Sequence, residues 1–258
     1  EYALSKAEMF QDYLDALDTT DVNSIAKANK KFKEIFNAGD SINNDQGVVD
    51  MVDFMHKVSL YGHQSAIDDE VDYSALVDIE VNGGKAPAEL EDAYKRINSN
   101  GYRVRQSEGM YSLQINPFYI QKEFYPYISS NMEIMLQQIA KENLEGYAED
   151  AAIIIPFQSL VQRVIWWEDF LKNNSNKAYT PLAQEQYGKY FNALTIGMDN
   201  TPAIESQQIA PYFQEAYSYM KDFAPSSDSY QQLKPYIDLL EQGKIDEAKE
   251  LVEGLLKH

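Results

Sequence analysis

Apolar residues recur at three- and four-residue steps through most of this chain, and this spacing restricts its fold more than any other feature. Such a repeat gathers apolar side chains on one face of an α-helix. The pattern covers the segments 5–17, 21–36, 47–63, 87–97, 129–139, 159–171, 180–194, 211–223, 230–240 and 246–256. We therefore expect a mainly α fold built from stacked antiparallel helical hairpins.

The middle of the chain loses this helical pattern. Aromatic and β-branched residues around a turn at Ser107–Gly109 predict one small β-hairpin near residues 102–116. A further short strand, separate from the hairpin, is expected at Ala75–Val81. We expect a helical region with a β-hairpin insertion over 1–126 and a helical-hairpin region over 127–258, which together form one continuous body.

The polar run Asn43–Gly47 is expected to be a break between two helices, because Gly and Asn favour turns. The helix that precedes it carries the only basic cluster of the chain, which we interpret as a solvated helix face. Its members are Lys27, Lys30, Lys31 and Lys33.

The charge of the chain limits its partners. Among 258 residues, 41 are acidic and 22 are basic, which gives a net charge of −19. A surface this negative repels phosphate backbones and anionic lipids, so we expect no nucleic-acid partner. The longest apolar run, Ala151–Phe157, is far too short to span a bilayer, so we expect no direct membrane insertion by this segment.

The chain contains no cysteine, which excludes disulfides, thiolate metal sites and a cysteine nucleophile. Of its three histidines, His56 and His63 lie seven residues apart without the acidic neighbour of a zinc-binding helix, and His258 is the last residue. Only hard cations held by carboxylates remain possible, and the acidic cluster Asp68–Asp72 lacks the alternating ligand order and glycine of a calcium loop. We therefore expect no metal site and no cofactor.

The compartment is an expectation from composition. An acidic, cysteine-free chain rich in Tyr, Asn and Gln is typical of extracytoplasmic bacterial proteins, secreted or envelope-anchored, although an acidic cytosolic protein can have the same composition. The chain begins at Glu1, either because a targeting or lipoprotein leader is cleaved there or because the chain was trimmed. We expect an extracytoplasmic location.

The last two helical segments resemble a tetratricopeptide hairpin. In YIDLLEQGKIDEAKELVEGLL, residues 236–256, Gly243 occupies the turn and the small Ala248 lets two helices approach. Ile245, Val252 and Leu255 also fall where that family packs helix on helix. The resemblance extends over about residues 160–257, and it implies a helical repeat with a protein-binding or scaffolding surface rather than a reaction.

A shorter segment, Tyr111–Pro117, resembles the hairpin strand of lysozyme-like muramidases and lytic transglycosylases in its Gln-Ile-Asn-Pro sequence. Those enzymes protonate a glycosidic oxygen with a glutamic acid from an upstream helix, in a partly apolar cleft. The resemblance implies Glu89 or Glu91 in that role. Neither is followed by the serine of the transglycosylase pair, and Gly109 stands at the position of the second lysozyme carboxylate.

Tyrosine is abundant, with nineteen in the chain, and Trp166 and Trp167 are adjacent. Because adjacent helical residues point about 100° apart, Trp167 can join the apolar stripe while Trp166 reaches an edge. We expect a partner to bind at an aromatic surface whose residues are Trp166, Tyr187, Tyr190 and Tyr217. The leading hypothesis is a non-enzymatic binding or scaffold protein with a protein or envelope-glycan partner; the alternative is a peptidoglycan glycan hydrolase.

Overall fold

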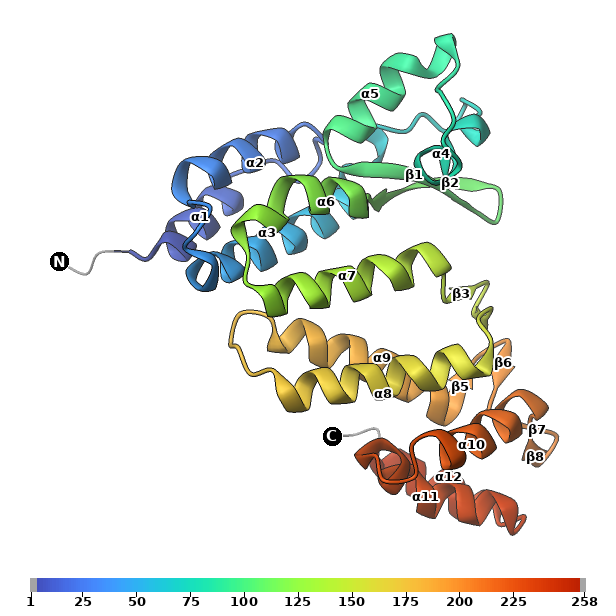
Figure 1. Ribbon diagram of the computed structural model, residues 1–258. Helices are drawn as coiled ribbons and strands as arrows, with labels where there is room; N and C mark the ends of the chain where they lie inside the picture. Colours follow the sequence, from blue (N-terminus) through green and yellow to red (C-terminus); the bar gives the residue numbers. More distant parts are fainter. Residues whose placement is uncertain (1–3, 256–258) are drawn as a thin grey trace. The chain divides into compact units, whose positions relative to one another are not determined.

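The computed structural model describes residues 4–255, which form twelve α-helices, short 3₁₀ turns and four two-stranded antiparallel sheets (Figure 1). The expectation of a mainly α fold is confirmed. The chain divides into two compact units, one up to Ile134 and one from Met135 onward. None of the helices in residues 4–255 has both the length and the apolar character needed to cross a membrane.

The first unit holds six complete helices, one β-hairpin and the start of a seventh helix. These elements are α1 (Lys6–Asp15), α2 (Ser24–Ile35), α3 (Ser41–Tyr61), α4 (Ile79–Asn82), α5 (Glu91–Ser99), β1 (Tyr102–Ser107), β2 (Met110–Ile115), α6 (Pro117–Phe124) and α7 (Ser130–Glu145). The hairpin expected near residues 102–116 is confirmed, since β1 pairs with β2 from Tyr102–Ile115 to Ser107–Met110.

Local signals and aromatic packing explain the start of this unit. Ser5 caps α1, because its hydroxyl accepts from the Glu8 amide at 3.2 Å while the Glu8 carboxylate accepts from the Ser5 amide at 2.7 Å. Behind this cap, the rings of Phe10, Phe32 and Phe36 are buried against one another. Phe10 meets each of the other two edge to face at 5.6 Å between centroids, so α1 and α2 share one core.

The expected break at Asn43–Gly47 is wrong, because α3 begins at Ser41 and runs through this segment. Tertiary contacts compensate for its poor helical propensity. The buried Asn44 amide donates to the carbonyls of Asn37 at 2.7 Å and Tyr127 at 2.9 Å. Gly47 is required by space, since a Cβ there would lie 2.4 Å from the Phe36 ring. The polar side chains of this segment predict a loop, but in the structure they anchor a helix.

The strand expected at Ala75–Val81 is also wrong. Residues 74–76 form a 3₁₀ turn, and α4 follows after Asp78, which adopts a left-handed conformation with φ 53°. Only Val77 makes a β-bridge, to Val104 in β1. The apolar residues Leu76 and Ile79 are both buried, and their spacing of three residues is that of a helical face rather than of a strand. The segment Ala75–Val81 is too short for its sequence pattern to distinguish a strand from two helical turns.

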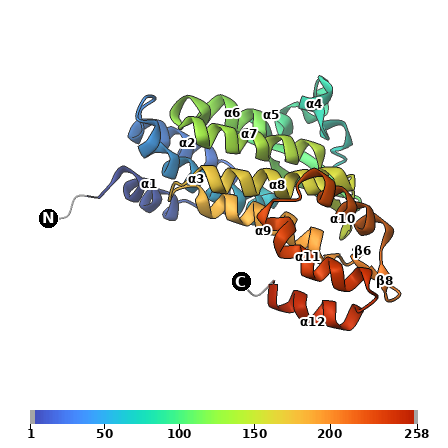
Figure 2. The ribbon, with the colours of Figure 1, turned by 60° about the horizontal axis from the view of Figure 1, so that its bottom comes forward.

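The second unit contains the rest of α7, five further helices and three very short hairpins. These elements are β3 (Ala148–Glu149), β4 (Ala152–Ile153), α8 (Phe157–Asn173), α9 (Thr180–Ile196), β5 (Gly197–Met198), β6 (Thr201–Pro202), β7 (Ile204–Glu205), β8 (Gln208–Ile209), α10 (Pro211–Phe223), α11 (Asp228–Glu241) and α12 (Ile245–Leu255). Helices α8 and α9 run side by side, and α11 packs on α12 (Figures 1 and 2).

The three short hairpins of the second unit were not expected from the sequence. Two of them turn through pairs of non-glycine residues with positive φ: Asp150 and Ala151 at 46° and 51°, and Ser206 and Gln207 at 50° and 63°. This is the type I′ geometry, for which Asn-Gly is the usual sequence signal. The hairpins were missed because these residue pairs do not carry that signal.

Replacing Ala151 by glycine is expected to stabilise the protein by about 0.5–1 kcal/mol. The left-handed conformation costs a residue with a Cβ about 1–2 kcal/mol, and the greater chain entropy of unfolded glycine cancels part of the gain. Ala151 is exposed, so little packing is lost. Thermal melts measure the effect. The control Ala152→Gly, outside the left-handed region, should lower the melting temperature; a shift of both variants in the same direction would refute the strain argument.

Candidate functional site

Trp166 lies on α8 with its ring half-buried, as the sequence predicted for an edge position. The indole stacks on Phe170 at 5.3 Å between centroids and an interplanar angle of 10°. Its neighbour Trp167 is fully buried, so the assignment of Trp167 to the core is confirmed. The two rings meet edge to face at 4.8 Å.

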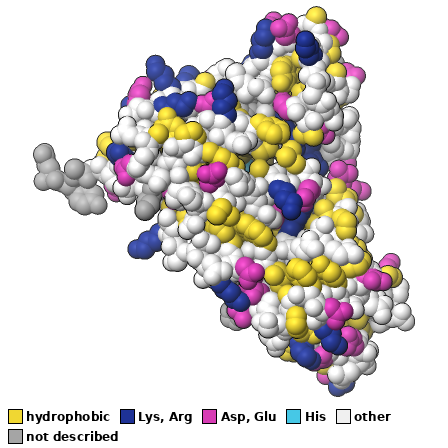
Figure 3. All heavy atoms as spheres, in the orientation of Figure 1, with side chains coloured by type: hydrophobic (Ala, Val, Ile, Leu, Met, Phe, Trp, Pro, Cys, Tyr) yellow, Lys and Arg dark blue, Asp and Glu magenta, His cyan; other side chains and the backbone are white. Residues whose placement is uncertain are grey.

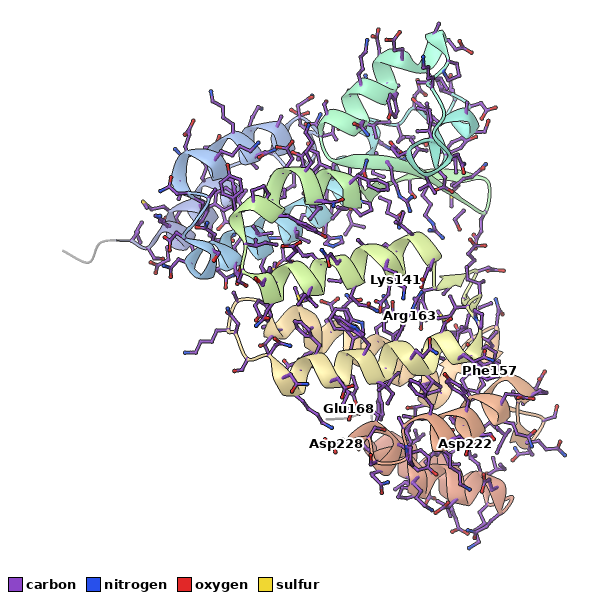
Figure 4. All side chains as sticks on the ribbon, in the orientation of Figure 1. Lys141, Phe157, Arg163, Glu168, Asp222 and Asp228 are labelled. Atoms are coloured by element: carbon purple, nitrogen blue, oxygen red, sulfur yellow. The ribbon has the colours of Figure 1, made fainter. Side chains whose placement is uncertain are left out.

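The Trp166 ring borders a pocket of about 370 Å³ within the second unit. The residues that line it come from α7, α8 and α10, and we call them together the Trp166 surface. They are Gln138, Lys141, Glu145, Ser159, Gln162, Arg163, Ile165, Trp166, Asp169 and Phe223. Figure 4 marks Lys141 on α7 and Arg163 on α8, which both line this pocket. The Phe223 ring is 49 % exposed and stacks on Tyr219 at 5.2 Å. The surface thus combines two accessible aromatic rings with charges of both signs.

A buried network of hydrogen bonds holds together the helices that carry the Trp166 surface. Glu142 accepts from the Trp167 indole N–H, with its two oxygens at 3.0 and 3.2 Å, and burial raises the pKa of its carboxyl. Arg163 donates to Glu145 at 3.0 Å, to the Gly146 carbonyl at 2.9 Å and to the Tyr190 hydroxyl at 3.1 Å. Because Arg163 is buried and tied to α7 and α9, it fixes the position of α8.

The expectation that Tyr190 and Tyr217 lie at an aromatic surface is wrong, since their rings are only 1 % and 3 % exposed. Tyr190 receives the Arg163 hydrogen bond and meets Tyr147 edge to face at 5.2 Å. The Tyr217 hydroxyl donates to the carbonyls of Leu194 at 3.1 Å and Thr195 at 3.3 Å. Tertiary structure supplies each hydroxyl with a partner, so both rings belong to the core.

Tyr187 is half-buried but does not join the Trp166 surface. Its hydroxyl lies 3.0 Å from the Ser229 hydroxyl at the start of α11, and Ser229 in turn bonds to Glu168 on α8. Residues two apart on a helix point about 200° from each other, so Glu168 and Trp166 serve opposite sides of α8. The binding role of Trp166 and of Tyr187 stays a prediction, and the two lie on separate surfaces.

Both glutamates of the hydrolase alternative are exposed. Glu91 forms an ion pair with Lys95 at 2.7 Å, and the hydrogen bond from Lys95 holds the pKa of this carboxyl below its usual 4.5. A glycosidic general acid needs the opposite, a partly apolar cleft that raises its pKa. The surroundings of Glu91 therefore count against general acid catalysis there.

The muramidase-like segment has structural roles in this fold. Gln114 accepts from the buried Arg103 guanidinium, at 2.8 Å from Nε. Asn116 caps α6, because its side-chain oxygen accepts from the Phe118 amide at 3.0 Å, and Pro117 stands in the first turn of that helix. Hairpin and helix geometry thus account for these residues without substrate contact.

The histidines show no metal arrangement in the part of the chain described. His63 lies 3.7 Å from Asp69, His56 is exposed on α3, and His258 is outside the described residues. Across residues 4–255, no group of three His, Asp or Glu side chains is placed to hold a metal ion.

Sequence reasoning missed Glu142, Arg163 and Glu168, although each left a signal. Arg163 and Glu168 stand three or four residues from apolar core positions of α8, and Glu142 stands three residues from the apolar Ile139 of α7, where a charge is rarely found unless it is paired. Comparison with known proteins adds no assignment to this site: no protein-family model matches the chain, no curated protein matches its sequence, and no solved structure matches its fold.

Proposed function

We propose that this chain is a non-catalytic binding protein of the cell envelope or extracellular space that holds a protein partner at the Trp166 surface. The observation that carries the proposal is the half-buried Trp166 ring at the edge of a pocket that the exposed Phe223 also lines. Tryptophan is among the residues most enriched where binding energy concentrates at protein interfaces. The charges around the ring, such as Lys141 and Asp169, suit the polar rim of such an interface.

The scaffold part of the proposal is supported by the last two helices. Gly243 lies in the turn between α11 and α12, and the small Ala248 is buried where the helices pack. Ile245 and Val252 are also buried in this pair. The side chain of Leu255 lies outside the described part. We propose that this pair acts as a tetratricopeptide-like hairpin, which presents surfaces for binding rather than a reaction centre.

The extracytoplasmic location is supported by composition alone, namely an acidic chain without cysteine. Fractionation of the native cells tests it, with an antibody against the chain and marker proteins for each fraction. Recovery with the cytosolic markers would contradict the proposed compartment and leave the binding site unaffected.

Trp166→Ala is expected to weaken partner binding about thirtyfold, because loss of an interface tryptophan commonly costs about 2 kcal/mol. Peptides selected from a displayed library on the purified wild-type protein would be synthesised and titrated by calorimetry against wild type, Trp166→Ala and Phe223→Ala. Tyr61→Ala is the matched control, since this α3 tyrosine is 65 % exposed and lies outside the Trp166 surface. Its affinity should equal that of the wild type.

Two results would contradict the proposal. One is a selection that enriches no peptide, or only peptides that bind Trp166→Ala as tightly as wild type. The other is catalysis: muropeptides released from purified peptidoglycan by the wild type, but not by Glu89→Gln or Glu91→Gln, would establish the hydrolase alternative.

A further inference from the structure

A second and larger pocket lies wholly within the first unit. It is a groove of about 740 Å³, and its walls are α2, α4, α5 and α6. The residues that line it are Ala26, Asn29, Lys30, Lys33, Glu80, Tyr94, Asn98, Ser99, Asn116, Phe118, Tyr119, Lys122 and Glu123. We call it the α2–α6 groove. It shares no residue with the Trp166 surface, and its ligand is inferred independently of the function proposed above.

The lysines interpreted from sequence as a solvated helix face contribute to this groove. Figure 3 shows Lys and Arg side chains gathered over α2, and Lys30 and Lys33 of that helix line the groove together with Lys122 of α6. The carboxylate of Glu123 is shared, because it pairs with Lys33 and lies 3.4 Å from Lys122. Lys30 has no acidic partner within 4.0 Å among the described residues. Three ammonium groups therefore face two carboxylates here, in a protein of net charge −19.

Aromatic and amide groups make up most of the remaining wall. Phe118 is 44 % exposed at the start of α6, and the Tyr94 and Tyr119 rings are half-buried. Asn29 donates to the Tyr119 hydroxyl at 2.7 Å and to Glu123 at 3.1 Å. Exposed rings beside amides and hydroxyls are suited to sugars, which present both an apolar face and many hydroxyl groups.

Two acceptors in the wall have no hydrogen-bond partner among the described residues. They are Asn29 Oδ1 and Glu80 Oε2, and both atoms are buried. Glu80 Oε1, in contrast, accepts from the Asn98 amide at 3.1 Å. Buried acceptors without donors are costly, and a ligand hydroxyl or an ordered water that reached them would offset this cost. Sulfate, a fully deprotonated inorganic anion, has acceptors only and cannot supply a donor.

We propose that the α2–α6 groove binds an acidic oligosaccharide. Its apolar sugar face would lie on Phe118, its hydroxyls would serve the amides and orphaned acceptors, and its carboxylate would meet Lys30. A cationic ligand is disfavoured by the three lysines, and a purely apolar ligand would leave the buried acceptors Asn29 Oδ1 and Glu80 Oε2 unsatisfied.

Calorimetric titration of the full chain tests this proposal with defined saccharides. The acidic probes are hexagalacturonate and sialyllactose, and their neutral counterparts are methyl-esterified hexagalacturonate and lactose. At least one acidic probe should bind saturably. Its neutral counterpart should bind about tenfold more weakly or worse, because it loses a charge-assisted hydrogen bond.

Groove variants connect the binding to this site. Phe118→Ala and Lys30→Gln should each weaken the acidic probe about tenfold or more. Lys27→Gln is the matched control, since this α2 lysine lies 3.9 Å from Asp21 and outside the groove. Its affinity should be unchanged.

Four outcomes would overturn the inference: no saturable binding by any acidic probe, equal affinity for the neutral counterparts, unchanged affinity of Phe118→Ala and Lys30→Gln, or complete competition by equimolar sulfate. None of these results bears on the Trp166 surface, so the two proposals fail separately.

Discussion

Trp167→Ala is expected to lower the free energy of unfolding by about 4 kcal/mol. The Trp167 side chain is completely buried, with a relative solvent exposure of 0 %. Truncation of such a buried ring leaves a cavity that the surrounding core fills only in part. The change also removes the N–H donor of the buried Glu142, whose two oxygens lie 3.0 and 3.2 Å from it. Loss of a donor to a buried carboxylate adds to the cost of the cavity.

Urea unfolding, followed by circular dichroism, measures this loss. Trp166→Ala is the matched control, because it deletes the same side chain from the next position, where the ring is half-buried. We expect the control to lose less than half as much stability as Trp167→Ala. Equal losses would mean that both rings serve the core, and the Trp166 surface would then lose its main support as a binding site.

Much of the helical architecture was predictable because its signals are local. The segment 211–223 was expected to be a helix and α10 has the same bounds, since Pro211 opens the helix and the aromatic residues repeat with helical spacing. The same reasoning separated Trp166 from Trp167, because a turn of about 100° per residue is set by the helix itself. Such features do not depend on what packs against the helix.

The errors occur where distant residues decide the outcome. The polar start of α3 is helical because Asn44 finds carbonyl partners at Asn37 and Tyr127, which no local pattern contains. The α2–α6 groove likewise requires Asn29 to meet Glu123, 94 residues later. Tyr190 and Tyr217 could not be separated from surface tyrosines, because their hydroxyl partners come from other elements.

The sequence carries one signal that marks the ends of the hairpins. An Ile-x-Pro-aromatic sequence follows three of the four hairpins and opens the next helix. Its three copies are Ile115–Phe118, Ile154–Phe157 and Ile209–Tyr212. Proline is the first residue of α6 and α10 and the N-cap of α8, so it fixes the helix start, and the isoleucine two residues before it ends the strand or its extension. The repeat marks where each β-hairpin gives way to a helix, although the turns themselves lack their usual residues.

Glu168→Ala is expected to cost about 2–3 kcal/mol, because this carboxylate joins two helices of the second unit. Glu168 is 6 % exposed on α8 and accepts from the backbone amides of Asp228 at 2.9 Å and Ser229 at 2.8 Å, at the start of α11. It also accepts from Lys172 at 2.5 Å. Its removal leaves helix N-terminal amides and a buried hydroxyl without their charged acceptor.

The stability that the Glu168 carboxylate contributes should decrease as the pH falls. Burial alone raises the pKa of Glu168, but the hydrogen bonds from Lys172, Ser229 and Asp228 outweigh burial and leave the pKa below its usual 4.5. A carboxyl whose pKa is lowered in the folded state contributes its full stability above the unfolded pKa, and this contribution is lost as pH falls through the folded pKa. Glu168→Gln, which keeps the shape and removes the charge, should therefore differ most from wild type at pH 7.

Urea unfolding at pH 7, 5 and 3 measures this dependence, followed by tryptophan fluorescence, since both tryptophans lie in the second unit. The difference between wild type and Glu168→Gln should stay constant between pH 7 and about pH 5 and shrink at pH 3. Asp169→Asn, the exposed neighbour, is the control and should match wild type at pH 7 within about 0.5 kcal/mol. A constant difference down to pH 3 would show that Glu168 stabilises the α8–α11 junction by its shape rather than by its charge.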